Sequence, residues 1–538
     1  MKKLLLILVL FISFNSFNSI AQEDAWVYFT NKPNASTFLA NPLTMLSQRA
    51  LDRRTTQNIA LDITDVPVHQ LYIDQVAAAA GITVMAKSKW LNSVHVRGSQ
   101  ADIQALTSLS FVNSIDFANN ALNTRLAQPK DLKIKKVNKE FEQLVTYNYG
   151  GSNNQVQMLN GHLLHQQDYT GQGKIIAVLD SGFIGVDTAA PFQNLITNNQ
   201  ILGGYNFPDR NTNYFSRHNH GTSVLSCMGG FVDGQLIGTA PNAQYYLFIT
   251  EDVNSENPVE ESYWVEAAEV ADSLGVDVIN SSLGYFEYDN PAYSYSYSDM
   301  NGTTAFASRG ADMAFNKGMM VVISAGNSGN SSNPYVGVPA EAINVLAVGA
   351  VDSNENYASF SSIGPSFDGR IKPDVCAKGQ GTTVSTTSGS IVTGSGTSYA
   401  SPVLAGMVAT FWSAIPSLTN IQLRQFIKES ADLFANPTAQ KGYGVPDFQL
   451  ALTNALNATD FTIENPILYP NPATSQIILA SEIKNGSFLL FNNLGQLVKE
   501  EIIAKKVQNF NVENLQSGIY YYQITSPTTN LKGKIIKQ

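Results

Sequence analysis

The sequence predicts an α/β protein built around a doubly wound parallel sheet, with a small α+β domain before it and a small all-β domain after it. Three patterns favour this fold. Over 148–456, short apolar runs alternate with stretches of helical length. Before that region, short strand patterns are separated by helical ones, and after it apolar and polar residues alternate between prolines. These patterns are typical of a helix-covered parallel sheet, an α+β unit and an antiparallel sheet, respectively.

The first residues have the composition of an export signal. Two lysines follow the initiator methionine, an apolar run covers 4–14, and small residues lead to Ala21. A run of about eleven residues is too short to cross ~30 Å of hydrocarbon as a helix. We therefore expect a signal peptide over 1–21, removed near Ala21, rather than a membrane anchor. The mature protein should be secreted or held at the cell surface, with no stable membrane insertion.

The segment 22–130 is expected to form the α+β domain, because strand and helix patterns alternate along it. Ser99 is a suitable N-cap for the second helix. A polar, lysine-rich stretch follows and predicts an exposed linker over 131–147. The predicted strands are 26–30, 82–85 and 93–96, and the predicted helices are 66–80 and 100–109.

The central domain, 148–456, contains runs that are apolar on both faces, as strands of a parallel sheet must be. Its ligand crevice should lie outside the carboxyl ends of those strands. A linker over 457–465 leads to the β-rich domain, 466–538. The predicted central strands are 174–179, 244–249, 276–280, 319–324 and 343–348, the helices 262–274 and 304–316, and the terminal strands 476–479, 487–491 and 518–524.

Charge and cysteine content exclude some classes of protein. The formal net charge is -10, which argues against nucleic-acid binding because phosphate contacts need clustered Lys and Arg. The two cysteines, Cys227 and Cys376, have no short metal-binding spacing, so a disulfide framework is excluded. They can form one bridge or remain two buried thiols, and we favour thiols because both lie in predicted core elements.

Two motifs offer an acid and a base where strands end and helices begin. Asp180 ends the apolar run 175–179, where its carboxylate can orient an imidazole, although acids at strand ends also cap helices or bind metals. His220 precedes Gly and Thr at the start of a helical run. Together with His218 it could instead form a metal pair, but neither an H-E-x-x-H motif nor a nearby acid cluster completes such a site.

Two further motifs offer an amide and a hydroxyl. Asn327 lies in a Gly-rich turn after a predicted strand, where it can imitate a backbone turn or aim its amide at an oxyanion. Ser398 precedes an apolar helix predicted over 403–412, and a helix N-terminus favours an attacking alkoxide. The structural alternative is that Ser398, or Ser401, caps the helix.

Together these motifs resemble the subtilisin-like serine proteases, the subtilase family, whose chain order is also Asp, His, Ser. The resemblance covers about 155–452. It implies a secreted endopeptidase with Asp180, His220 and Ser398 as triad, Asn327 as oxyanion donor, and an acyl-enzyme intermediate. An α/β-hydrolase esterase would need the order Ser, acid, His and a G-x-S-x-G elbow. The alternative from another class is a catalytically silent surface adhesin with this fold.

The resemblance also implies a peptide-binding cleft for protein or peptide substrates. Ser281, Ser282, Leu283 and Gly284 would form one wall of the specificity pocket, and Ala325 and Gly326 the other. A tyrosine-rich segment, 285–302, is expected to overhang this cleft as a loop. Tyr399 stands where many relatives have Met, which removes an oxidisable thioether beside the nucleophile. No cofactor is required and no metal site is predicted, although calcium remains an option because relatives often bind it.

Family resemblance also implies a function for each of the regions before and after the central domain. Residues 22–130 occupy the place of the family's inhibitory propeptide, which makes the chain a zymogen. Segments such as 469–473, 493–496 and 515–520 resemble a type IX secretion system sorting domain. This implies export through the periplasm and recognition by the type IX machinery, while the alternative is a generic β accessory module that binds polymer.

Overall fold

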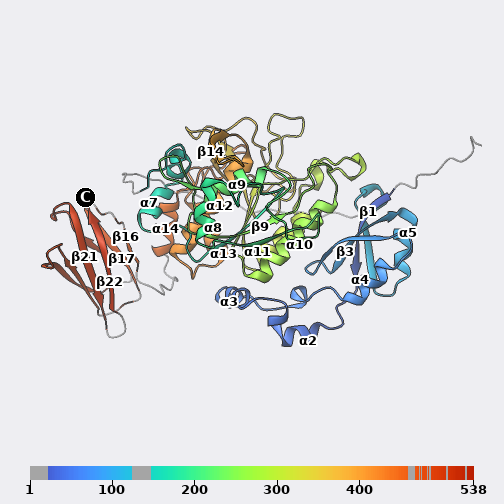
Figure 1. The fold of residues 1–538 in the computed structure, drawn as a ribbon, viewed down its shortest axis with the longest axis horizontal. Helices are drawn as coiled ribbons and strands as arrows, with labels where there is room; N and C mark the ends of the chain where they lie inside the picture. The colour runs from blue at the N-terminus through green and yellow to red at the C-terminus, as the bar shows by residue number, and fades with distance from the viewer. Residues whose placement is uncertain are drawn as a thin grey trace, which may run out of the picture.

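The computed structural model describes residues 22–123, 147–457 and 467–538, the last without 470, 472, 474, 482, 484–485, 505–506 and 527–529. Figure 1 shows three regions along the chain, coloured blue, green to orange, and red. The predicted signal peptide over 1–21, with its cleavage near Ala21, lies outside the described residues. So do nearly all of the predicted linkers 131–147 and 457–465.

The N-terminal region is a four-stranded antiparallel sheet in the order β2-β3-β1-β4. Ser99 caps α5, because its hydroxyl accepts the N–H of Asp102. The helix predicted over 66–80 is shorter than expected, since Val66 is extended before Pro67. The elements are β1 Gln22–Phe29, α2 Ala35–Ala40, α3 Gln48–Thr56, α4 Gln70–Ala77, β2 Thr83–Ser88, β3 Ser93–Ser99, α5 Gln100–Ala105 and β4 Val112–Phe117.

The central region contains a seven-stranded sheet in the order β13-β12-β11-β10-β5-β9-β6, and every neighbouring pair is parallel. All residues of β5 and β11 are buried, as the sequence predicted. The strands are β5 Ile175–Asp180, β6 Ile201–Asn206, β9 Gln244–Ile249, β10 Val278–Ser281, β11 Met320–Ser324, β12 Leu346–Val351 and β13 Val375–Lys378.

Helices cover this sheet. Helices α9 and α12 pack against each other, as do α10 and α11. The helices are α6 Asn153–Gln157, α7 Gly161–Gln166, α8 Gln193–Thr197, α9 His220–Gly229, α10 Val259–Leu274, α11 Phe306–Asn316, α12 Thr397–Ala414, α13 Asn420–Glu429 and α14 Phe448–Asn457. Two short hairpins add β7 Phe231–Val232 with β8 Leu236–Ile237, and β14 Thr382–Ser385 with β15 Ile391–Gly394.

Two predictions about element ends were wrong. The strand expected over 343–348 begins only at Leu346, because the backbone N–H groups of Ile343 and Asn344 bind the Asp312 carboxylate instead of a neighbouring strand. The helix expected to begin at 403 begins at Thr397. Ser401 therefore lies inside α12, where it is buried and cannot act as a cap.

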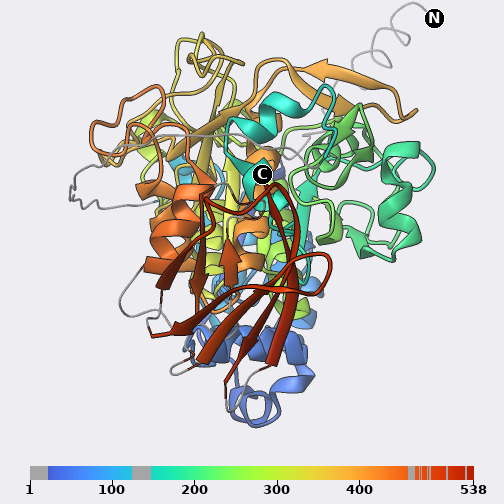
Figure 2. The same ribbon diagram turned by 90° about the vertical axis from the view of Figure 1, so that its left-hand side faces the viewer.

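The C-terminal region consists of two antiparallel sheets, β16-β17-β20 and β19-β18-β21-β22. The two sheets share one hydrophobic core, in which Phe488 of β18 stacks on Phe510 of β20 at 4.2 Å. Figure 2 shows these red strands facing the viewer. The strands are β16 Ile467–Tyr469, β17 Gln476–Ala480, β18 Gly486–Phe491, β19 Leu497–Ile503, β20 Val507–Asn511, β21 Gly518–Thr525 and β22 Asn530–Lys537. The predicted all-β region is confirmed.

Two general expectations can be compared with the structure. Within the three described ranges, no helix has both the length and the apolar character needed to span a bilayer. Cys227 and Cys376 are both buried and free, as we favoured from the sequence. Burial raises the pKa of the Cys376 thiol to about 12, and that of Cys227 also rises because of burial.

Candidate active site

Polar side chains gather at the carboxyl edge of the central sheet. Asp180 is the last residue of β5, Ser281 ends β10 and Ser324 ends β11. Strand β10 lies between β5 and β11, so the turns that follow these three strands are neighbours in space. This is the edge at which an open α/β sheet binds its ligands.

Asp180 and His220 are in direct contact. His220 begins α9, and its Nδ1 lies 2.8 Å from Oδ1 of Asp180. The carboxylate is fully buried, and Oδ1 also accepts the backbone N–H of Ser181 at 2.7 Å. The negative charge of Asp180 raises the pKa of His220 above its usual value, in spite of the burial of the ring. Because Nδ1 is engaged, Nε2 is the ring nitrogen left for proton transfer.

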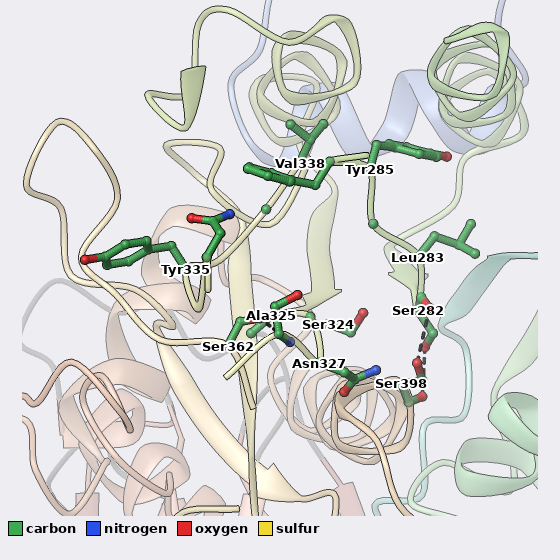
Figure 3. Close-up of a pocket in the computed structure, with 16 residues that line it drawn as sticks. Ser282, Leu283, Tyr285, Ser324, Ala325, Asn327, Tyr335, Val338, Ser362 and Ser398 are labelled. Atoms are coloured by element: carbon green, nitrogen blue, oxygen red, sulfur yellow. Dashed lines mark hydrogen bonds between the residues drawn. The ribbon is translucent and has the colours of Figure 1, made fainter. Parts of the chain in front are cut away.

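Ser398 is the second residue of α12, whose N-cap residue is Gly396. Its hydroxyl is turned to the carbonyl oxygen of Ser282 at 3.4 Å, and the Ser282 hydroxyl donates to the Ser398 carbonyl at 2.9 Å (Figure 3). Among the described hydrogen bonds, none joins Ser398 to His220. The ring of the next residue, Tyr399, has its centroid 6.2 Å from that of His220. The hydrogen bond between a catalytic serine and its histidine often tightens only when substrate binds.

Asn327 follows β11 and is fixed by the first residue of α12. Its Oδ1 accepts both the backbone N–H of Thr397, at 2.9 Å, and the Thr397 hydroxyl, at 3.0 Å. Since the oxygen is engaged, the amide nitrogen faces the cavity, and Figure 3 shows it directed toward Ser398. The side chain thus has the structural role of a turn residue and still leaves a donor beside the serine.

A cavity of about 200 Å³ lies beside Ser398. Of the predicted wall residues, Ser282, Leu283, Gly284, Ala325 and Gly326 line it. Its lining consists of Ser282, Leu283, Gly284, Tyr285, Phe286, Ser324, Ala325, Gly326, Asn327, Ser328, Asn333, Tyr335, Gly337, Val338, Ser362 and Ser398.

Ser281 is not part of this lining. It is buried, and its hydroxyl accepts the indole N–H of Trp264, on α10, at 2.9 Å. Gly326 must remain glycine, because its φ is +100° and an added Cβ would lie 2.8 Å from the Ser362 hydroxyl. Tyr335 and Ser362 were not assigned to the cavity from the sequence, since they lie in irregular segments with no periodic pattern.

The tyrosine-rich segment 285–302 differs from its prediction. Tyr285 lines the cavity, but Tyr285 and Tyr288 are buried against the core rather than overhanging it. The hydroxyls of Tyr288 and Tyr295 donate to Oε1 of Glu261 at 2.7 and 2.6 Å. The buried carboxylate of Glu261, on α10, supplies the acceptors that allow these phenols to pack inward.

The described residues contain no group of three or more His, Cys, Asp or Glu side chains arranged to hold a metal ion. His218 is engaged elsewhere. Its Nδ1 accepts the backbone N–H of His220 at 3.3 Å and lies 3.3 Å from the Ser181 hydroxyl.

Comparison with known proteins gives three matches along the chain. Residues 171–446 match the model described as subtilase family, 24–136 the peptidase S8 propeptide domain of Bacteroidota, and 467–538 the secretion system C-terminal sorting domain. The matches confirm the resemblances inferred from the sequence motifs.

Individual relatives agree with these matches. The chain is 32% identical over 300 residues to subtilisin NAT of Bacillus subtilis subsp. natto, covering 55% of this chain and 68% of the relative. It is 31% identical over 299 residues to a subtilisin of Bacillus pumilus, covering 55% of this chain and 97% of the relative. A solved structure, that of the MycP3 protease from the type VII (ESX-3) secretion system, aligns at a TM-score of 0.45 and 23% identity over 57% of this chain and 89% of that chain.

Proposed function

Because the chain belongs to the subtilase family, we propose that it is a secreted serine endopeptidase whose catalytic triad is Asp180, His220 and Ser398. Family membership already makes it a serine peptidase. The observation that supports these three residues most directly is the 2.8 Å contact between Asp180 and His220, next to a serine at the N-terminus of α12. A catalytically silent adhesin finds no support among the relatives.

The proposed mechanism follows from the orientation of these groups. The Ser398 hydroxyl rotates from the Ser282 carbonyl toward Nε2 of His220, which removes its proton as Oγ attacks the scissile carbonyl. Asp180 holds the ring in the required tautomer and stabilises the imidazolium. The amide of Asn327 and the backbone N–H of Ser398 donate to the oxyanion. His220 gives this proton to the leaving amine as the C–N bond breaks, which leaves an acyl-enzyme that water hydrolyses with His220 again as base.

The proposed substrate is an extended peptide. Its backbone would pair with 282–284, and main-chain hydrogen bonds of this kind bind many sequences. The side chain before the scissile bond would enter the cavity, between Leu283 and Gly284 on one side and Ala325 and Gly326 on the other. The cavity lining contains no charged residue. We therefore expect an uncharged side chain at that position.

The decisive test is labelling with a fluorophosphonate probe followed by mass spectrometry of the labelled peptide. The label should be found on Ser398, and Ser398→Ala should abolish both labelling and peptide hydrolysis. Ser395→Ala is a matched control, because this exposed serine lies three positions earlier and should leave both unchanged. Labelling of a different serine, or hydrolysis by Ser398→Ala, would reject the assignment.

The C-terminal sorting domain makes this a secreted or cell-surface protein. In finer detail, we propose that the signal peptide 1–21 is removed, that 22–130 acts as propeptide ahead of a linker over 131–147, and that 148–456 is the peptidase. The linker 457–465 then leads to 466–538, which the type IX machinery recognises. Truncation at Thr459 should preserve peptidase activity but leave the protein in the periplasm. Normal release of the truncated protein would reject the sorting role.

A further inference from the structure

One part of the N-terminal region lies apart from its sheet. Residues 42–66, between β1 and α4, contain α3 and two short 3-10 helices, and we name them the anchor segment. In Figure 1, α3 lies beneath the central region rather than beside the blue strands, and Figure 2 again shows blue helices at the bottom of the molecule. The anchor segment therefore contacts the peptidase separately from the β-sheet of the N-terminal region.

The centre of this contact is a buried ionic cluster on α10. Both carboxylate oxygens of Asp272 accept from Nη2 of Arg54, at 2.7 and 2.8 Å. Nη2 of Arg53 donates to the same carboxylate. Asp272 is 0% exposed, Arg54 2% and Arg53 7%. A pair this deeply buried is costly to break on one side only, because the remaining charge is left without a partner.

The anchor segment also occupies the carboxyl end of α10. A helix end has unpaired carbonyl groups and a partial negative charge, which cations stabilise. Arg49 Nε donates to the Gly275 carbonyl at 3.0 Å, and Arg53 donates to the Val276 carbonyl. The backbone N–H of Ser47 donates to the Ser273 carbonyl at 2.8 Å. The arginines of α3 thus match the chemistry of this helix end.

A second set of contacts extends the surface toward α11 and α13. Gln57 donates to the Gly318 carbonyl at 2.7 Å and accepts the Asn420 backbone N–H at 3.0 Å. Lys317 lies 3.2 Å from Asp62 and 3.0 Å from Asp65.

The peptidase surface is also shaped to fit. An added Cβ at Gly275 would meet the Arg49 side chain at 2.8 Å, and one at Gly318 would meet Gln57 at 2.9 Å. Both glycines also have positive φ. The absence of a side chain therefore permits the turn and leaves room for Arg49 and Gln57.

This surface lies at the opposite edge of the sheet from the candidate active site. The backbone N–H of Asp277 donates to the carbonyl of Ile175, which begins β5, whereas Asp180 ends it. The five residue steps between them span about 16 Å, at about 3.3 Å per residue. The anchor segment therefore binds without touching the catalytic groups.

Strand β2 already contacts α10, where the Ser88 hydroxyl donates to Glu269 at 2.6 Å. We propose that the surface around Asp272 is a second docking site for the propeptide, recognised by the arginine-bearing helix α3. The anchor segment keeps the propeptide bound after the chain joining it to the peptidase has been cut. This contribution to binding does not depend on the proposed catalytic residues.

The test uses the full chain with Ser398→Ala, which removes self-cleavage, and a recognition sequence for a specific protease inserted after Ala127. After cutting, size-exclusion chromatography over a dilution series measures whether the N-terminal fragment stays with the remainder. The parent should co-elute. Adding Arg53→Met and Arg54→Met should raise the dissociation constant about 100-fold or more, as expected when a buried ion pair loses one side.

Arg97→Met is the matched control, because Arg97 pairs with Asp24 inside the N-terminal region and is 28% exposed. It should shift the dissociation constant less than about fivefold, as for an exposed ion pair. Asp272→Asn tests the same contact from the peptidase side, in case the double variant fails to fold. If the fragment dissociates from the parent and from the arginine variant with the same dissociation constant, the second docking site is refuted. The readout is association, so it remains valid even if labelling shows that Ser398 is not the nucleophile.

Discussion

Glu261 offers the sharpest test of how the cavity wall is supported. Its carboxylate, fully buried on α10, accepts hydrogen bonds from Tyr288, Tyr295 and the backbone N–H of Ala307, at 2.7, 2.6 and 2.8 Å. Through the two tyrosines it fixes the segment that continues from the cavity wall at Tyr285. We predict that Glu261→Ala destabilises the peptidase region and loosens that wall.

The magnitude follows from the donors left behind. A buried donor without a partner costs about 1–3 kcal/mol. Tyr295 is only partly buried as a residue, so we count at full cost only the donors of Tyr288 and Ala307. Their loss gives about 2–6 kcal/mol. Burial raises the pKa of Glu261, which means that desolvation already disfavours the ionised carboxylate, so removal recovers part of the cost. We expect a net loss of about 2–4 kcal/mol.

The assay is urea unfolding of Ser398→Ala with and without Glu261→Ala, followed by peptide KM in the active background. Glu261→Gln should cost less, because its amide oxygen still accepts from the tyrosines. Glu287→Ala is the control, since Glu287 is exposed in the same segment and should change neither stability nor KM. A loss below about 1 kcal/mol, with KM unchanged, would refute this account of the wall.

Three other outcomes are expected. Asn327→Asp preserves the oxygen that Thr397 binds but replaces the amide donor with negative charge. The kcat should therefore fall at least about 10²–10³-fold, the cost measured for such a donor in subtilisin itself, with little change in KM. A change in KM alone would contradict an oxyanion role. Because Asp180 raises the pKa of His220 and the base must be neutral, kcat/KM should rise with pH through a midpoint above the ordinary 6.5, and a midpoint at or below 6.5 would contradict the coupling. Tyr399→Met should make activity sensitive to hydrogen peroxide, measured as residual hydrolysis after exposure, and equal resistance of both forms would show that this position is not oxidised.

Much of the central sheet could be predicted because its strands are apolar on both faces, a pattern with few alternative interpretations. All five predicted runs contain a strand, although β12 begins late because Asp312 binds the preceding backbone. The edge strands β6 and β13 were missed. Strand β6 contains two adjacent glycines, Gly203 and Gly204, which interrupt the apolar pattern.

Part of the candidate site could likewise be predicted from the sequence, and part could not. Asp180, His220, Asn327 and Ser398 could be selected because each ends or follows a strand or lies at the start of a helix, so local pattern sets its position. The inward packing of the tyrosine-rich segment could not be predicted, because it depends on where the Glu261 carboxylate lies.

The anchor segment shows the same limit. Arg53 and Arg54 have the pattern of solvated charges on a surface helix. Their burial depends on Asp272, which lies 218 residues from Arg54 in the chain. No local sequence pattern carries that information.

The two free cysteines have a consequence for handling the protein. Cys227 and Cys376 are the only cysteines of the chain, and both are 0% exposed. Because they form no disulfide, a reductant such as dithiothreitol has no bond to break, and mild oxidants cannot reach either sulfur. We therefore expect the stability of this fold to be independent of redox potential.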